Sequence, residues 1–95
     1  MGITKRPVSQ PVLERLGSNV KRLRSAADLN QVEFAAACGM AQSTVSRIEM
    51  GSYPALDVDA VVRIALAARC SLGELLDGVD MAMEIVRFQT GTAVA

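Results

Sequence analysis

A glycine in the middle of a helical pattern is the feature that most constrains how this chain can fold. The segment FAAACGMAQSTVSRIEMG, residues 34–51, has helix-favouring residues on both sides of Gly39. Glycine costs roughly 1 kcal/mol relative to alanine inside a helix, but it adopts a left-handed backbone without a steric penalty. A corner of about 90–120° between two helices needs such a residue within a short turn. Gly39 therefore predicts two helices that meet at a sharp corner.

The residues around Gly39 have the sizes that this corner requires. Ala35 lies one helical turn earlier and is small enough to let two helices cross closely. Val45 and Ile48 are spaced to fill the angle between the helices. This combination indicates a helix-turn-helix, although the same spacing also arises by chance in alanine-rich helical proteins.

Apolar spacing and capping residues predict five helices. Spacings of three and four residues, which mark one buried helix face, begin at Val12, and capping boxes are formed by Asn30 with Glu33 and by Ser71 with Glu74. The expected helices run from Val12 to a terminus within residues 25–28, from a cap at Asn30 to Cys38, from Gln42 to Met50, from 58 to 68, and from Ser71 to about Leu76. In the fourth helix the residues expected to face inward are Val58, Val61, Val62, Ala65 and Ala68.

These elements divide the chain into a flexible N-terminal arm at residues 1–11, a helix-turn-helix domain at 12–77 and a C-terminal tail at 78–95. Apolar residues alternate along the tail, which favours a strand, but the tail is rich in residue types that favour a helix. A strand would need to pair with a strand of a second chain, whereas a helix needs only a groove on the same domain. Both structures remain open.

Composition argues against several classes of function. The chain has no histidine, no phosphate-cradling glycine loop and no convergent pair of carboxylates, so it is not expected to be an enzyme. Its two cysteines, Cys38 and Cys70, cannot supply the four ligands of a usual zinc site. We interpret them as small buried apolar residues, with a disulfide as the alternative. No metal or cofactor is expected.

Charge is zero overall but unevenly distributed. Residues 1–49 carry seven basic and four acidic side chains, whereas residues 50–95 carry three basic and six acidic ones. A chain polarised in this way can present a basic face to phosphate. Neither the apolar run of a signal peptide nor an apolar stretch long enough for a membrane span is present. We therefore expect no membrane partner and a cytoplasmic location.

Three motifs resemble those of a known family. From about Leu16 to Leu76 the sequence is similar to the DNA-binding domain of phage-repressor and Cro-type regulators, the XRE-like family, through LRSAADLNQVEFA, STVSRIEMG and CSLGELL. The resemblance implies an all-α, compact five-helix bundle of lambda-repressor type with a central helix-turn-helix. It also implies that the third helix enters the major groove of double-stranded DNA, and that the protein acts as a homodimeric repressor on a near-palindromic operator.

The resemblance assigns roles to individual residues. The positions that face base edges are Ala41, Gln42, Ser43 and Arg47. The positions that lie towards the DNA backbone are Gln31, Thr44 and Ser46. Arg24 and Glu49 match an ion pair that bridges the first helix to the end of the third, and Gly39 is the turn. The family commonly has a capping hydroxyl where this chain has Ala41, so that cap is expected to be absent.

The side chains of the third helix suit base recognition. Gln42 has the donor and acceptor that adenine requires, and Arg47 can donate two hydrogen bonds to guanine. The alternative is that this polar face is simply solvated. On the first helix Lys21 and Arg22 are candidate contacts to the DNA backbone, with a solvated face as an equal alternative.

The tail and the arm carry further candidate contacts. The apolar residues of the tail are the expected dimer surface, with Leu66 as an addition: Val79, Met81, Met83, Ile85, Val86 and Phe88. The alternative is that the tail covers the chain's own core. In the arm, Lys5 and Arg6 are candidates for phosphate or the minor groove. A rival function is an antitoxin-like or other protein-interaction module that binds a toxin-like partner and binds DNA only secondarily.

Overall fold

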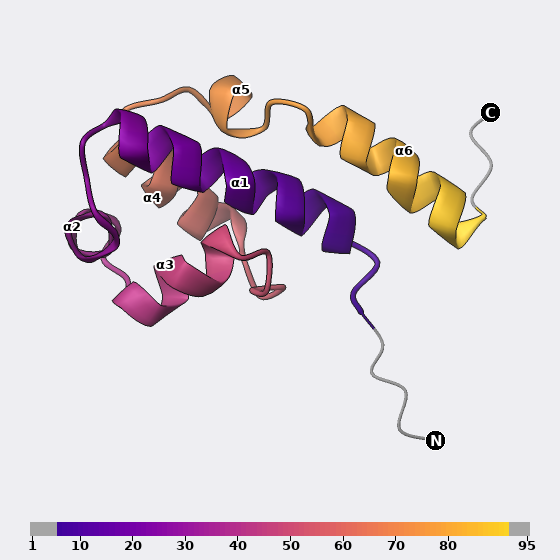
Figure 1. The fold of residues 1–95 in the computed structure, drawn as a ribbon, viewed down its shortest axis with the longest axis horizontal. Helices are drawn as coiled ribbons and strands as arrows, with labels where there is room; N and C mark the ends of the chain where they lie inside the picture. The colour runs from indigo at the N-terminus through magenta and orange to yellow at the C-terminus, as the bar shows by residue number, and fades with distance from the viewer. Residues whose placement is uncertain (1–5, 92–95) are drawn as a thin grey trace, which may run out of the picture.

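The structure is a computed structural model and describes residues 6–91. This part of the chain is built from helices. They are α1 (Gln10–Ala26), α2 (Gln31–Cys38), α3 (Gln42–Glu49), α4 (Val58–Ala68), α5 (Leu72–Leu75) and α6 (Val79–Thr90) (Figure 1). No strand occurs between residues 6 and 91, so the predicted all-α fold is confirmed. Within the same residues, no helix has both the length and the apolar character that crossing a membrane requires. The contact predicted for Lys5 lies outside the described residues.

The helix starts follow the predicted caps, except in α1. The side chain of Asn30 accepts a hydrogen bond from the amide of Glu33 at 2.8 Å, and the carboxylate of Glu33 accepts one from the amide of Asn30 at 2.9 Å. Ser71 and Glu74 form the same box at the start of α5. However, α1 begins at Gln10, two residues before the predicted start, with a proline in its first turn. Proline is tolerated there because that turn has no intrahelical acceptor for its missing N–H. Residues 10 and 11 therefore belong to α1 and not to the arm.

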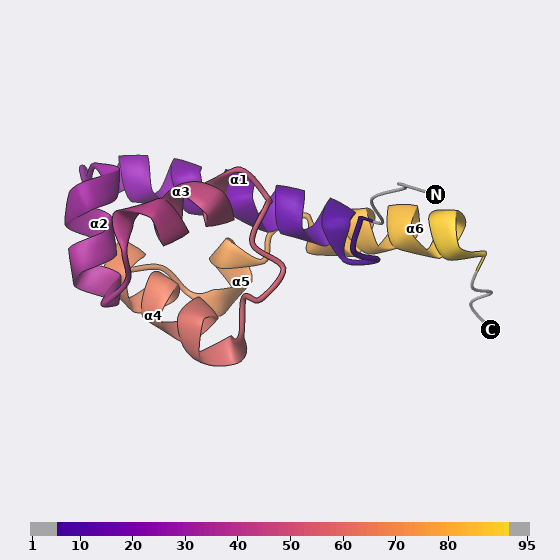
Figure 2. The same cartoon turned by 90° about the horizontal axis from the view of Figure 1, so that it is seen from below.

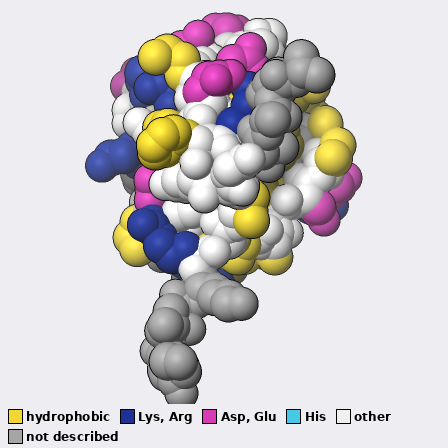
Figure 3. Space-filling view, turned by 90° about the vertical axis from the view of Figure 1, so that its right-hand side faces the viewer, with side chains coloured by type: hydrophobic (Ala, Val, Ile, Leu, Met, Phe, Trp, Pro, Cys, Tyr) yellow, Lys and Arg dark blue, Asp and Glu magenta, His cyan; other side chains and the backbone are white. Residues whose placement is uncertain are grey.

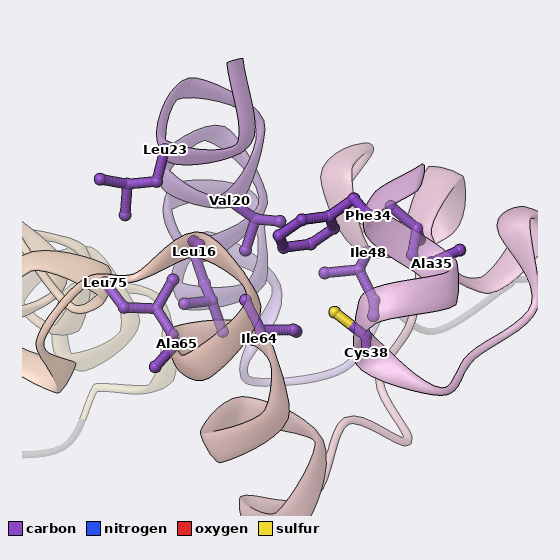
Figure 4. Close-up of a cluster of buried hydrophobic side chains, with 12 residues drawn as sticks. Leu16, Val20, Leu23, Phe34, Ala35, Cys38, Ile48, Ile64, Ala65 and Leu75 are labelled. Atoms are coloured by element: carbon purple, nitrogen blue, oxygen red, sulfur yellow. The ribbon is translucent and has the colours of Figure 1, made fainter. Parts of the chain in front are cut away.

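The core forms where α1, α2, α3, α4 and α5 meet. Phe34 of α2 is completely buried and points towards Val20 of α1 (Figure 4). Ile64 of α4 and Leu75 of α5 close the core from the other side, and Ile48 adds α3. The short helices are therefore held by one shared apolar cluster, which matters because isolated helices of this length are marginal in water.

The inward face of α4 differs from the prediction. Val58 and Val62 were expected to be buried, but their side chains are 78% and 40% exposed. Ile64 is buried in their place, and Ala65 and Ala68 are buried as expected. The run AVVRIALAA is apolar on nearly every side, so spacing within it cannot decide which stripe faces the core.

A close backbone contact joins α1 to α3 at Gly17. A Cβ atom built on Gly17 would lie 2.3 Å from the carbonyl oxygen of Ile48 and 2.9 Å from that of Glu49. No larger residue fits there unless the helices separate. Gly17 thus lets the end of α3 lie directly on α1.

The tail forms a helix, so the strand alternative is wrong. α6 runs antiparallel to α1 and lies beside its N-terminal half (Figure 1), and the two helices extend beyond the rest of the bundle (Figure 2). The buried Asn19 side chain donates hydrogen bonds of 2.8 Å to the carbonyls of Leu75 and Asp77, which precede α6. Arg15 donates a further bond to the carbonyl of Asp77 at 3.0 Å. These contacts attach the turn between α5 and α6 to α1.

We predict that Gly17→Ala lowers the free energy of unfolding by about 1–3 kcal/mol, because the added methyl group must push α3 away from α1. Gly73→Ala is the matched control. A Cβ at Gly73 meets only the Ser71 hydroxyl, at 3.7 Å, so this change should leave stability unchanged or raise it by up to about 1 kcal/mol. Urea denaturation followed by circular dichroism measures both. Equal stability of Gly17→Ala and the wild type would contradict the close contact.

Candidate nucleic-acid interface

The corner between α2 and α3 is built at Gly39. This residue ends α2 with φ 67° and ψ 36°, in the left-handed region. The amide of Met40 then bonds back to the carbonyl of Ala35 at 2.9 Å, which completes the turn. Val45 and Ile48 of α3 are 1% and 3% exposed, so they fill the angle between the helices.

The opposite face of α3 is polar and open to solvent. Gln42, Ser43 and Arg47 are exposed, and Thr44 and Ser46 are half-buried beside them. No side chain caps the N-terminus of α3, because Ala41 occupies the capping position. Helix N-termini attract anions, so the start of α3 suits a neighbouring phosphate.

A buried ion pair fixes the end of α3 to α1. The guanidinium of Arg24 donates two hydrogen bonds to the carboxylate of Glu49, from Nε at 2.6 Å and from Nη2 at 3.1 Å. A third bond runs from Nη1 to the carbonyl of Leu29 at 2.8 Å. The two charged side chains are only 12% and 3% exposed, and the hydrogen bond that Arg24 donates to Glu49 raises the pKa of Arg24 above its ordinary value. Arg24 therefore keeps its charge, and the pair fixes the end of α3 to α1 in one orientation.

Two glutamines extend this pair to the exposed face. The amide nitrogen of Gln31 donates to Glu49 at 3.0 Å, and the amide nitrogen of Gln42 donates to the side-chain oxygen of Gln31 at 2.7 Å. Gln31 begins α2 and Gln42 begins α3. These hydrogen bonds join a residue of α2 to residues of α3 across the corner. Because the partners are far apart in the sequence, local spacing did not reveal them.

The loop after α3 touches Arg47, which the sequence also did not indicate. The guanidinium carbon of Arg47 lies 5.1 Å from the centre of the Tyr53 ring. Ser52 donates to the carbonyl of Arg47 from its amide at 2.9 Å and from its hydroxyl at 3.2 Å.

The other basic candidates lie elsewhere. Lys21 is exposed on α1. Arg22 lies beside Ser71 and Glu74 around a surface hollow next to α5, and α5 and α3 lie on opposite sides of α1 (Figure 1). Arg6 forms an exposed ion pair with Glu14 at 2.6 Å. The structure thus brings together Gln31, Gln42 and Glu49, but it does not bring Arg22 to them.

The cysteines do not form the disulfide considered as an alternative. Cys38 is buried and Cys70 is half-buried, and both are free thiols. Burial is the main cause that raises the pKa of each thiol. Between residues 6 and 91, no three side chains of the metal-binding types lie close enough together to hold an ion.

Comparisons with known proteins agree with this arrangement. A helix-turn-helix family model, HTH_3, matches residues 20–75. Among solved structures, the chain is similar to the restriction-modification controller protein C.AhdI from Aeromonas hydrophila, with a TM-score of 0.63 and 27% sequence identity. The match covers 66% of this chain and 94% of the controller protein. No curated protein matches the chain.

We predict that Arg24→Met lowers the free energy of unfolding by about 3–5 kcal/mol, because it leaves the buried Glu49 carboxylate without a charged partner. The double variant Arg24→Met/Glu49→Met should recover most of this loss. As a control, Arg63→Met breaks the exposed pair with Asp59 and should change stability by less than about 1 kcal/mol. Chemical denaturation of the wild type and the three variants measures the free energy of unfolding of each. A double variant as unstable as Arg24→Met would show that the loss does not come from the unpaired charge.

Proposed function

The chain belongs to the helix-turn-helix family and is a DNA-binding regulator, and from this premise we propose that it is a cytoplasmic repressor that binds a near-palindromic operator as a homodimer. The observation that carries the proposal is the polar stripe on α3, which is exposed while the end of the same helix is fixed by a buried ion pair. The similar structure of a restriction-modification controller protein supports a regulatory role.

We propose that α3 reads bases in the major groove through Ala41, Gln42, Ser43 and Arg47. Arg47 would donate two hydrogen bonds to guanine, and Gln42 would pair with adenine. The side chain of Gln42 is bonded to Gln31 before DNA binds, so its amide group is already partly ordered. Each good two-bond contact contributes about 1–3 kcal/mol of discrimination between bases.

Contacts to phosphate would position α3 in the groove. Gln31, Thr44 and Ser46 border the exposed stripe, and Lys21 adds a charge on α1. Contacts of this type fix the register of a protein on the duplex without reading its sequence. Arg22 is not part of this proposed set, because it lies beside α5.

We propose that α6 is the dimerisation element. Its inner face is buried against α1 at Ala82 and Val86. Its outer face leaves Met81, Ile85 and Phe88 exposed by 76%, 50% and 89%. These three positions are four and three residues apart and so share one helix face. Figure 3 looks onto this end of the molecule, where hydrophobic side chains reach the surface among charged ones.

A dimer would bring a second copy of α3 to a second half-site of the operator. One such helix makes few base contacts, whereas a two-fold dimer places two of them about 34–36 Å apart, one turn of duplex DNA. Leu66 is exposed on α4, which lies away from α6 (Figure 2), so we leave it out of the proposed dimer surface.

We predict that Arg47→Ala weakens binding to a duplex selected from a random pool by about 1–3 kcal/mol. Thermal stability should change by less than about 1 kcal/mol, because Arg47 is exposed. Arg69→Asn is the control: it removes the same charge at the end of α4, and asparagine tolerates the left-handed backbone found there. Fluorescence anisotropy titrations measure binding. Unchanged affinity of Arg47→Ala would remove this residue from the interface.

We predict that Phe88→Glu converts the dimer to a monomer without unfolding it, because a charge replaces an apolar side chain that is 89% exposed in one copy and would be buried between two. Leu66→Glu, at a residue 72% exposed on α4, should leave the dimer intact. Light scattering gives the mass of each variant. A dimeric Phe88→Glu protein or a monomeric Leu66→Glu protein would place the interface elsewhere. A wild-type chain that is monomeric and captures a different protein through α6 would favour the rival interaction module.

A further inference from the structure

The loop after α3 holds one aromatic residue against the arginine that is proposed to read guanine. Tyr53 is half-buried, and its ring lies under the Arg47 guanidinium at 5.1 Å. This distance is within the roughly 6 Å over which the negative face of an aromatic ring attracts a cation. None of the ion pairs formed within residues 6–91 includes Arg47. Within the described residues, therefore, the partner of the Arg47 guanidinium is an aromatic ring and not a carboxylate.

The ring is itself fixed by its surroundings. Ser52, the preceding residue, bonds through its amide and its hydroxyl to the carbonyl of Arg47. Tyr53 packs against the apolar core, and its carbonyl accepts a bond from the amide of Leu56 at 3.3 Å. Pro54 follows and restricts the backbone of Tyr53 to extended conformations. The loop thus places the ring at a set position relative to the last turn of α3.

We propose that Tyr53 is a positioning residue that orders the Arg47 side chain for base recognition before DNA arrives. A carboxylate partner would occupy the N–H groups of the guanidinium, which are the groups that must bind guanine. An aromatic face instead attracts the guanidinium without accepting its N–H groups as a carboxylate does, so these groups stay available to guanine. Ordering a long side chain at an interface costs free energy, and a side chain that is already ordered loses less on binding. The inference rests on the proposed role of Arg47.

The test compares Tyr53→Phe with Tyr53→Met on two duplexes. The first duplex is selected from a random pool by the wild-type protein. The second differs from it at the single base pair where Arg47→Ala loses discrimination. The readout is the ratio of the two affinities, which does not depend on the fraction of protein that is folded. Methionine fills the space of the ring with apolar contacts but has no aromatic face.

We expect Tyr53→Phe to keep the wild-type ratio, because it keeps the ring. Tyr53→Met should lower the ratio by about two- to fivefold, the factor expected for one exposed contact of this kind. In an Arg47→Ala background the ratio is already lost, so the readout there is the affinity for the selected duplex. The methionine substitution should not lower this affinity further, since the ring acts through the arginine.

Three results would overturn the inference. Tyr53→Met with the wild-type ratio would show that the ring does not affect recognition. A loss in Tyr53→Phe as large as that in Tyr53→Met would assign the effect to the hydroxyl group, as in a direct phosphate contact. An equal loss of affinity for the selected duplex with and without Arg47 would show that Tyr53 acts independently of it. Failure of the proposed role of Arg47 gives a different result: Arg47→Ala itself would bind both duplexes as the wild type does.

Discussion

The buried ion pair between Arg24 and Glu49 is the interaction on which the placement of α3, the proposed reading helix, depends. Taking both charges out of water is costly, and their attraction offsets this cost only in good geometry. The two hydrogen bonds between them are satisfied in one orientation of α3 relative to α1. Gly17 adds a steric condition, because the backbone of α3 lies directly against it. The pair thus specifies an arrangement, whatever its net contribution to stability.

In this arrangement the residues of α3 that stabilise the fold differ from those proposed to contact DNA. The helix has eight residues and buries only Val45 and Ile48, so it depends on tertiary contacts and not on intrinsic helix propensity. The rest of the helix is polar, and its residues Gln42, Ser43 and Arg47 are exposed. Substitutions on that face are therefore expected to leave the corner, the ion pair and the core unchanged. The hydrogen bond between Gln31 and Gln42 links the fixed frame to this face.

Local signals predicted most of the fold, and non-local contacts account for what was missed. The corner at Gly39 and the capping boxes depend on residues within a few positions of one another, so they are visible in sequence. The burial of Ile64 depends on which face of α4 is turned towards the core. An almost uniformly apolar helix does not show this in its sequence. The buried Asn19 bonds to carbonyls 56 and 58 residues away, so no local pattern could indicate that the tail helix would be fixed to α1. The sequence did not point to Tyr53, because its partner, Arg47, lies on α3 whereas Tyr53 lies in an irregular loop.

The exposed apolar face of α6 and the exposed polar face of α3 lie on different elements, and both elements are attached to α1. In the proposed dimer, α1 would therefore connect the dimer interface to α3. The central claim is that α3 enters the groove of the duplex. Nitrogen–proton correlation spectra of the labelled protein, recorded while the selected duplex is added, test this most directly. The account predicts that the largest shifts fall at residues 41–47 and at Gln31, with small shifts in α4. Shifts confined to α4 or α6, with residues 41–47 unchanged, would contradict it.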